Sequence, residues 1–222
     1  GSRKGLIVFG RDITEKKKAE QALYKRISEL EALRTIDRAI TSSFNVQITL
    51  EILLKQAIHN LDVDAAAILV LDPDLQILKY MAAEGFRQSN IESTEVRPGQ
   101  GLAGTVMLER RILQVNDPQA VEADKPFAQS EGFQVYFGIP LIARGQLKGV
   151  LEIYLRAIAS FDTAWANFLE TLADQAAIAV DTSQLFDILQ HKNLELAFAY
   201  DATITSWASA LELREGESHG HS

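Results

Sequence analysis

Apolar residues recur every three or four positions over residues 14–43 and again over residues 162–213, and this spacing predicts a long helix near each end of the chain. Along the first of these helices the apolar stripe is narrow and the other faces are charged, which is the pattern of a parallel coiled coil. A helix packed on its own domain is the alternative. The stripe consists of Leu23, Ile27, Leu30, Leu33, Ile36 and Ile40. We therefore predict a coiled-coil linker helix over residues 14–34.

The second helical pattern is longer than a domain of this size needs. Neither proline nor glycine occurs between Phe161 and Arg214. One helix, or two abutting helices, would therefore extend over roughly 50 residues, about 75 Å at ~1.5 Å per residue. Asp162 is expected to cap its N-terminus. Such a helix needs a partner to cover its apolar positions, and a second copy of the chain is the simplest one. We expect a homodimer formed through the N- and C-terminal helices.

Between the two long helices the pattern changes to short apolar runs separated by turn-forming residues, which indicates β-strands. Residues 116–132 are polar and are expected to be irregular. The order of elements predicts an α+β domain with a central antiparallel sheet and helices on one face. The expected elements are a helix at 46–61, strands at 65–71 and 75–83, a short strand near 93–97, a short helix at 102–109, a strand at 112–115 and a hairpin of 134–142 with 147–155.

Composition narrows the function classes. The net charge of -8 disfavours nucleic-acid binding, because the phosphate backbone would be repelled. The absence of cysteine excludes disulfides, thiolate metal sites, a cysteine nucleophile and a thioether-linked chromophore. No apolar run is long enough to cross a bilayer, and no signal peptide opens the sequence. We therefore expect a cytoplasmic protein with no membrane contact in this part of the chain.

Three segments resemble GAF domains, and they occur in the family's order. Residues 97–106 (RPGQGLAGTV) are similar to the glycine-rich element that leads from a strand into a helix. Residues 138–153 (GIPLIARGQLKGVLEI) are similar to the C-terminal hairpin, and residues 161–180 are similar to the closing helix. The resemblance implies a GAF-like domain over residues 35–185 that acts as a regulatory sensor.

Both flanks resemble parts of other signalling domains. Residues 1–13 resemble the end of a truncated PAS domain, and residues 186–222 resemble an output linker helix with the start of a truncated HD-GYP phosphohydrolase. Glu217 and His221 match metal-ligand positions of some HD-GYP members, and residues four apart on a helix can face one metal ion. The sequence stops before the histidine-aspartate pair and the GYP segment. The resemblance implies a parent of the form PAS, GAF, HD-GYP, and we expect no enzyme activity and no metal site in this chain by itself.

A ligand pocket, if present, should lie between the sheet and residues 116–136. The alternative is that the same residues fill an ordinary core. GAF domains that bind cyclic nucleotides often carry an Asn-Lys dipeptide, whereas Asn116 is followed here by Asp117. We therefore predict neither cyclic AMP nor cyclic GMP and assign no cofactor, only an unidentified small molecule. The predicted lining is Ile68, Val70, Tyr80, Phe127, Phe133, Tyr136, Phe137 and Glu152.

Three functions remain as hypotheses. The first is a regulatory module that binds a small ligand, or receives an upstream signal, and relays it through dimeric helices to a phosphohydrolase output domain. The second is cyclic di-GMP phosphodiesterase activity. The third is a ligand-free dimerisation spacer. In the first hypothesis the coupling residues are Leu23, Ile27 and Leu30 at the entry helix and Leu185 and Leu189 at the exit helix.

Overall fold

The computed structural model describes residues 17, 27, 46–87, 94–124, 131–158 and 161–218. The described residues up to Ala179 belong to one compact unit, and those from Val180 onward belong to a second. Lys17 and Ile27 are helical. The rest of the predicted coiled coil, the PAS-like residues 1–13, Phe127 and His221 lie outside the described residues.

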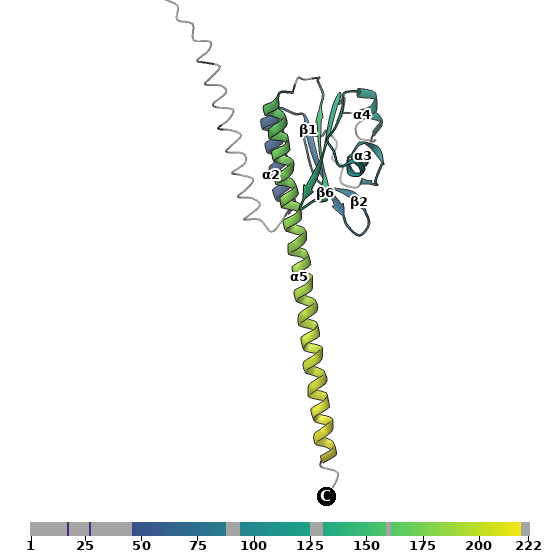
Figure 1. Cartoon of the computed structure of the whole chain (residues 1–222), viewed down its shortest axis with the longest axis vertical. Helices are drawn as coiled ribbons and strands as arrows, with labels where there is room; N and C mark the ends of the chain where they lie inside the picture. The colour runs from purple at the N-terminus through teal and green to yellow at the C-terminus, as the bar shows by residue number, and fades with distance from the viewer. Residues whose placement is uncertain are drawn as a thin grey trace, which may run out of the picture. The chain divides into compact units, whose positions relative to one another are not determined.

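Six antiparallel strands form one sheet in the order β3-β2-β1-β6-β5-β4 (Figure 1). The long hairpin of β5 and β6 pairs with β1 through β6. The α+β class and the central antiparallel sheet are thereby confirmed. The strands are β1 (Ala65–Asp72), β2 (Ile77–Glu84), β3 (Glu95–Val96), β4 (Leu113–Val115), β5 (Val135–Ala143) and β6 (Gln146–Leu155).

Helices cover both faces of the sheet (Figure 1). On one face lie α2 (Val46–Leu61) and the first part of α5 (Thr163–Ser218), where the indole N–H of Trp165 donates to the carbonyl of Leu61 at 3.0 Å. On the opposite face lie α3 (Gly101–Glu109) and α4 (Pro118–Asp124). The sequence prediction placed helices on one face only, and α3 and α4 correct that detail.

The sequences of the central strands explain why helices must pack on both faces of the sheet. Seven consecutive residues of β6, from Gly149 to Leu155, are buried, and so are the first five residues of β1. Successive side chains of a strand point to opposite faces, so a continuous buried run supplies apolar side chains to two layers. In the layer between the sheet and α3, Val106 of α3 belongs to one buried apolar cluster with Ala67, Leu69 and Val150 of the sheet.

Local polar contacts fix the ends of the elements. Asp72 Oδ1 accepts hydrogen bonds from the N–H groups of Asp74 and Leu75, both at 3.1 Å, which closes the turn before β2. Asp162 Oδ1 accepts from Trp165 N–H at 2.7 Å, so Asp162 caps α5 as expected. α5 is one helix of 56 residues rather than two abutting ones.

The polar stretch between β4 and β5 corrects another expectation. It was predicted to be irregular, yet α4 occupies seven of its residues. Asp117 caps this helix, because its Oδ1 accepts from Gln119 N–H at 3.0 Å. α4 buries Val121 completely and thereby closes one side of the core.

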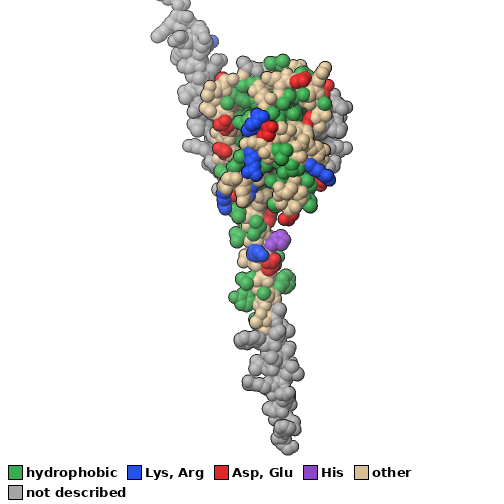
Figure 2. Space-filling view, turned by 45° about the vertical axis from the view of Figure 1, so that its right-hand side comes forward, with side chains coloured by type: hydrophobic (Ala, Val, Ile, Leu, Met, Phe, Trp, Pro, Cys, Tyr) green, Lys and Arg blue, Asp and Glu red, His purple; other side chains and the backbone are tan. Residues whose placement is uncertain are grey.

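No helix among the described residues is both long and apolar enough to span a membrane. On the face drawn in Figure 2, basic and acidic side chains of the first unit are interspersed with hydrophobic ones. That face therefore presents no large patch of a single charge.

Candidate functional site

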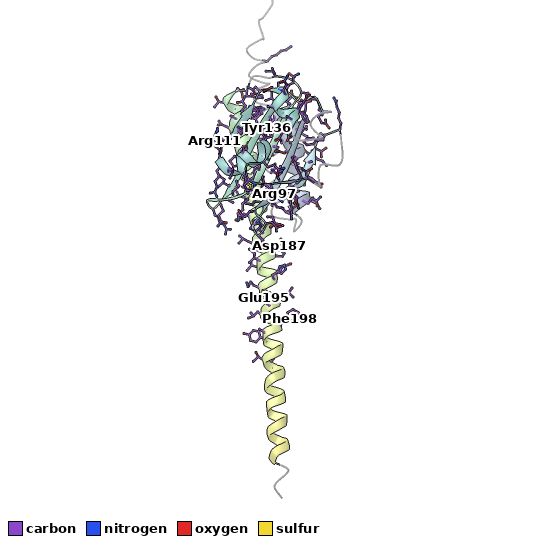
Figure 3. The ribbon with its side chains drawn as sticks, turned by 90° about the vertical axis from the view of Figure 1, so that its right-hand side faces the viewer. Arg97, Arg111, Tyr136, Asp187, Glu195 and Phe198 are labelled. Atoms are coloured by element: carbon purple, nitrogen blue, oxygen red, sulfur yellow. The ribbon has the colours of Figure 1, made fainter. Side chains whose placement is uncertain are left out.

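A buried group of polar side chains lies between the sheet and the α3/α4 layer. Along β6, Glu152 and Tyr154 point to this layer, because they alternate with Leu151 and Ile153. Tyr136 of β5 lies opposite Tyr154, and both pack with Val121 of α4. Figure 3 labels Tyr136 within the sheet region. We call Tyr80, Tyr136, Glu152 and Tyr154 the tyrosine–glutamate site.

Glu152 joins two strands that are far apart in sequence. Its Oε2 accepts a hydrogen bond from the Tyr80 hydroxyl at 2.7 Å, and its Oε1 accepts one from the Tyr136 hydroxyl at 3.2 Å. The Glu152 side chain is fully buried. A buried carboxylate is tolerated only when such donors replace water. The two tyrosines therefore hold the carboxylate in a fixed position across β2, β6 and β5.

Gly138 makes room for this arrangement. It lies directly opposite Glu152 in the β5–β6 ladder. A Cβ at Gly138 would come within 2.5 Å of the Tyr136 hydroxyl oxygen and within 2.6 Å of Val106 Cγ2. Any side chain at this position would push the Tyr136 hydroxyl away from Glu152, so the glycine is part of the site.

A second carboxylate borders the tyrosine–glutamate site. Asp124, the last residue of α4, accepts a hydrogen bond through Oδ1 from Leu102 N–H at 2.6 Å, in the first turn of α3. A Cβ at Gly101 would collide with the same carboxylate. Burial is the main cause that raises the pKa of Tyr80, Tyr136 and Tyr154, and the negative charge of Asp124 is one of the smaller causes.

Tyr154 differs from Tyr80 and Tyr136 because its hydroxyl, which we call the solitary hydroxyl, makes no hydrogen bond to the described residues. The residue is 1% exposed, and its hydroxyl has no hydrogen-bond partner among the residues the structure describes. Its ring packs tightly, with centroid distances of 4.8 Å to Phe133, 5.3 Å to Tyr136 and 5.4 Å to Phe86. Buried polar groups are nearly always satisfied by protein or by ordered water, so this hydroxyl is a position where a water molecule or a small-molecule guest would gain a hydrogen bond.

Burial keeps the three hydroxyls neutral. Loss of hydration is the largest cause that raises the pKa of Tyr80, Tyr136 and Tyr154 well above 10.0, and the Glu152 charge is the next. Each tyrosine is therefore a hydrogen-bond donor at neutral pH and cannot supply a negative charge.

The raised tyrosine pKa values predict alkaline instability. The folded state holds its phenolic protons more tightly than the unfolded chain does. The stability that these tyrosines contribute is thus fully present below the unfolded pKa of about 10 and is lost as pH rises above it. We expect the native protein at pH 10.5 to show about two fewer phenolates by absorbance at 295 nm than the same protein in urea, because three tyrosines of pKa about 10 would each be roughly three-quarters ionised in the unfolded chain. Equal absorbance of the two samples would contradict the buried placement.

The structure brings together only part of the predicted pocket. Tyr80, Phe133, Tyr136 and Glu152 lie in the layer facing α3 and α4. By strand alternation, Ile68, Val70 and Phe137 belong to the opposite face. Tyr136 and Phe137 are consecutive in one strand, so they could not both have lined the same pocket.

Two members of the site were missed by the sequence prediction. Tyr154 stands two positions after Glu152 in a strand, which places it on the same face, and this spacing could have identified it. Asp124 could not be found in this way, because it belongs to the helix that was expected to be irregular chain.

A separate ionic cluster fixes one end of the sheet. Arg156 follows β6 and contacts Glu131 Oε2 at 2.7 Å and Asp64 Oδ1 at 3.3 Å. Its Nε donates to the Glu131 carbonyl at 3.0 Å, while Glu131 Oε1 accepts from Arg87 N–H at 2.7 Å. The Arg156 guanidinium also lies 4.9 Å from the centre of the Phe133 ring. These bonds connect segments at the ends of several strands. We therefore interpret the cluster as one that stabilises the fold rather than as a binding site.

The described ranges contain no group of three His, Asp or Glu side chains that could hold a metal ion. Glu217 lies in the last turn of α5, and His221 lies outside the described residues. The structure therefore leaves the predicted metal-ligand pair untested.

Comparison with known proteins identifies the family to which this chain is similar. The sequence matches the family described as GAF domain over residues 45–181. It is also similar to two solved structures of GAF domains from phosphoenolpyruvate-protein phosphotransferases. The Coxiella burnetii domain is 23% identical with a TM-score of 0.64 and covers 73% of this chain and 98% of that one. The Acinetobacter domain is 24% identical with a TM-score of 0.59 and covers 72% of this chain and 96% of that one.

A further relative is a longer protein of which only one segment matches this chain. The chain is 28% identical over 158 residues to a protein of Escherichia coli (strain K12) named for the phosphoenolpyruvate-dependent phosphotransferase system. The match covers 70% of this chain but only 21% of that relative's length. The similarity is therefore confined to one segment of the larger protein.

Proposed function

Because the chain belongs to the GAF domain family, a regulatory sensor fold, we propose that it controls an attached output domain by binding a small molecule at the tyrosine–glutamate site. The observation that carries this proposal is the solitary buried hydroxyl of Tyr154 beside the buried carboxylate of Glu152. Leaving a buried polar group unsatisfied costs about 1–3 kcal/mol. A module that served only as a spacer would gain by filling these positions with apolar side chains.

Strand β5 supplies a route from the site to the exit helix. Tyr136 faces the site, and the next residue, Phe137, faces the other layer. Phe137 packs on Phe161 at 4.8 Å and on Trp165 at 5.0 Å between ring centres. Trp165 is in the first turn of α5. A ligand that shifts Tyr136 would therefore also shift the contacts at the start of α5. Regulation requires only that the ligand favour one of the two arrangements.

The second part of the proposal is a homodimer through the helices. From Val180 onward the described side chains of α5 include large exposed apolar ones, and Figure 2 shows hydrophobic side chains on the coloured part of this helix. Leu189 is 61% exposed, and Phe198, labelled in Figure 3, is 72% exposed. Exposed apolar positions on a long helix are stabilised by a partner helix. We propose a second copy of the chain as that partner, and the N-terminal coiled coil over residues 14–34 stays a prediction.

The output domain is proposed from the sequence alone. The resemblance of residues 186–222 to the start of an HD-GYP phosphohydrolase, with Glu217 and His221 as ligand candidates, supports a phosphohydrolase output after an upstream PAS domain. The Escherichia coli relative supports a phosphotransferase instead. Cytoplasmic location also stays a prediction.

Native mass spectrometry of freshly purified protein tests the proposal. We expect a dimer that retains a small molecule. Replacing Leu189 and Leu196 by Asp should give a monomer, whereas the control Gln190→Asp should stay dimeric. A dimer without a bound molecule would support the spacer hypothesis instead. Turnover of cyclic di-GMP by this chain in the presence of manganese would support the enzyme hypothesis.

A further inference from the structure

We propose that an open groove at one end of the sheet binds a small organic anion, in which a carboxylate or a similar group is attached to an apolar body. The groove has a volume of about 400 Å³, and small-molecule sites typically measure roughly 300–1,000 Å³. It shares no residue with the tyrosine–glutamate site, so the inference goes beyond the proposed function and does not depend on it. We call it the α3 groove, and its lining includes Leu71, Gln76, Leu108, Arg110, Gln146 and Leu147.

The antiparallel order of the strands brings two turns to this end of the sheet. β1 ends at Asp72, β6 begins at Gln146, and the two strands pair in antiparallel orientation. The β1–β2 turn and the β5–β6 turn therefore lie beside each other. The end of α3 packs on the same region, because Met107 belongs to one buried apolar cluster with Leu147. The groove is thus bounded by segments that the fold holds in place.

One wall of the α3 groove is apolar and open to solvent. Leu108 of α3 lines the groove and is 61% exposed. A Cβ at Gly99 would come within 3.1 Å of Leu108 Cδ1, so the leucine side chain lies against the turn that precedes α3. Leu71 is half-buried and Leu147 is buried at the base. A guest with an apolar body would remove this surface from water, which is favourable.

Arg110 supplies a cation in the lining of the groove. The residue ends α3 in a left-handed conformation with φ of 50°, and its N–H donates to the carbonyl of Val106 at 2.9 Å. The backbone that carries the side chain is therefore fixed. Within the described ranges the Arg110 guanidinium makes no ion pair or hydrogen bond. Its N–H donors are available to a guest, and their fork matches the geometry of a carboxylate.

Two further cations lie beside the groove. Arg97, labelled in Figure 3, directly precedes Pro98, which belongs to the lining. Lys148 Nζ donates to Oε1 of the lining residue Gln146 at 3.3 Å. Together with Arg110, these residues place three positive charges at one groove of a chain whose net charge is -8.

The negative charges near the groove are fewer. Asp72 is paired with Lys79 at 3.0 Å, and Glu109 is paired with Arg111 at 2.6 Å. Asp74 then opposes the three cations, and the C-terminus of α3 adds about half a negative charge. The sum at the groove is positive, so an anionic group is attracted and an ammonium group is repelled.

The test compares three probes that share a phenylbutyl body and differ in the end group: 4-phenylbutanoate, 4-phenylbutan-1-ol and 4-phenylbutylamine. Each probe is titrated into the nitrogen-15-labelled full chain at low ionic strength, and dissociation constants are taken from the amide chemical shifts. We expect the carboxylate to bind about fivefold more tightly than the alcohol, and the amine to bind most weakly. The largest shifts should occur at Arg110 and Gly145. Tighter binding of the amine, no binding of the carboxylate, or shifts confined to other parts of the domain would overturn the inference.

A pair of arginine variants tests the charge. Arg110→Asn removes the cation, and asparagine tolerates a positive φ, so the fold should be retained, as circular dichroism would show. We expect it to bind 4-phenylbutanoate about fivefold more weakly, which is the upper range for an exposed ion pair. The control Arg87→Asn changes the net charge equally, but Arg87 follows β2 at the opposite end of the sheet. Equal affinities of the two variants would contradict the inference.

Leu108→Ala tests the apolar wall separately. The side chain is largely exposed, so its truncation should have little effect on stability. We expect 4-phenylbutanoate and 4-phenylbutan-1-ol to lose affinity by the same factor, with their ratio unchanged, because the variant removes apolar contact and no charge. Unchanged affinity for both probes would place them outside the α3 groove and overturn the inference.

Discussion

Replacing Arg156 by alanine is expected to lower the free energy of unfolding by about 3 kcal/mol. The change removes the cation from a fully buried Glu131 carboxylate and deletes the bonds to Asp64 and to the Glu131 carbonyl. Loss of one partner from a buried ion pair costs about 3–5 kcal/mol, and the lower end applies because the Arg156 side chain is 22% exposed. Urea denaturation followed by circular dichroism measures the loss.

The control for this prediction is Arg111→Ala. Arg111 pairs with Glu109 at 2.6 Å, but both side chains are well exposed. A surface pair of this kind contributes about 0–1 kcal/mol. A similar loss in the two variants would show that Arg156 acts only as a surface charge. A second check is the double variant Glu131→Leu with Arg156→Met. It should recover part of the loss, because no buried charge then remains without its cation.

Replacing Glu152 by leucine is expected to lower the free energy of unfolding by about 2–6 kcal/mol. The side chain stays nearly the same size, yet the hydroxyls of Tyr80 and Tyr136 lose the acceptor that both of them use. A buried donor without a partner costs about 1–3 kcal/mol, and this variant creates two. The thermal midpoint and urea denaturation should both report the loss.

The triple variant Tyr80→Phe, Tyr136→Phe and Glu152→Leu tests the cause. It removes donors and acceptor together, and replacing both partners by apolar groups is nearly neutral in many cases. We therefore expect the triple variant to be more stable than Glu152→Leu alone. If it were less stable, the loss would come from packing rather than from unpaired hydroxyls.

The sequence was most informative where a pattern was long and bounded by clear stop signals. The helix at 46–61 was predicted with the bounds that the structure shows, because its apolar spacing is regular. The β5–β6 hairpin was placed to within one residue, since Gly145 marks its turn. α4 was missed because seven residues show little periodicity. Its start signal was present, however, with Asp117 as cap and Pro118 in the first turn.

The candidate site was harder to predict, because it depends on which face each side chain takes and on contacts between distant strands. Strand alternation separates Tyr136 from Phe137, and that rule was available from the sequence. The bond from Tyr80 to Glu152 joins residues 72 positions apart and follows from the order β2-β1-β6. Only the three-dimensional sheet brings these two strands to either side of β1.

Because α5 is a single helix without a break, a change in its length would change both the position and the rotational orientation of whatever follows it. Each helical residue turns the chain by about 100° and advances it by ~1.5 Å. Four added residues would therefore rotate whatever follows by about 40°, whereas seven would return it to within about 20° of its original direction. The length of this 56-residue helix thus fixes the rotation about the helix axis between its two ends. If the proposed output domain follows this helix, natural variation in the length of the helix should favour whole heptads, since other lengths would rotate that domain.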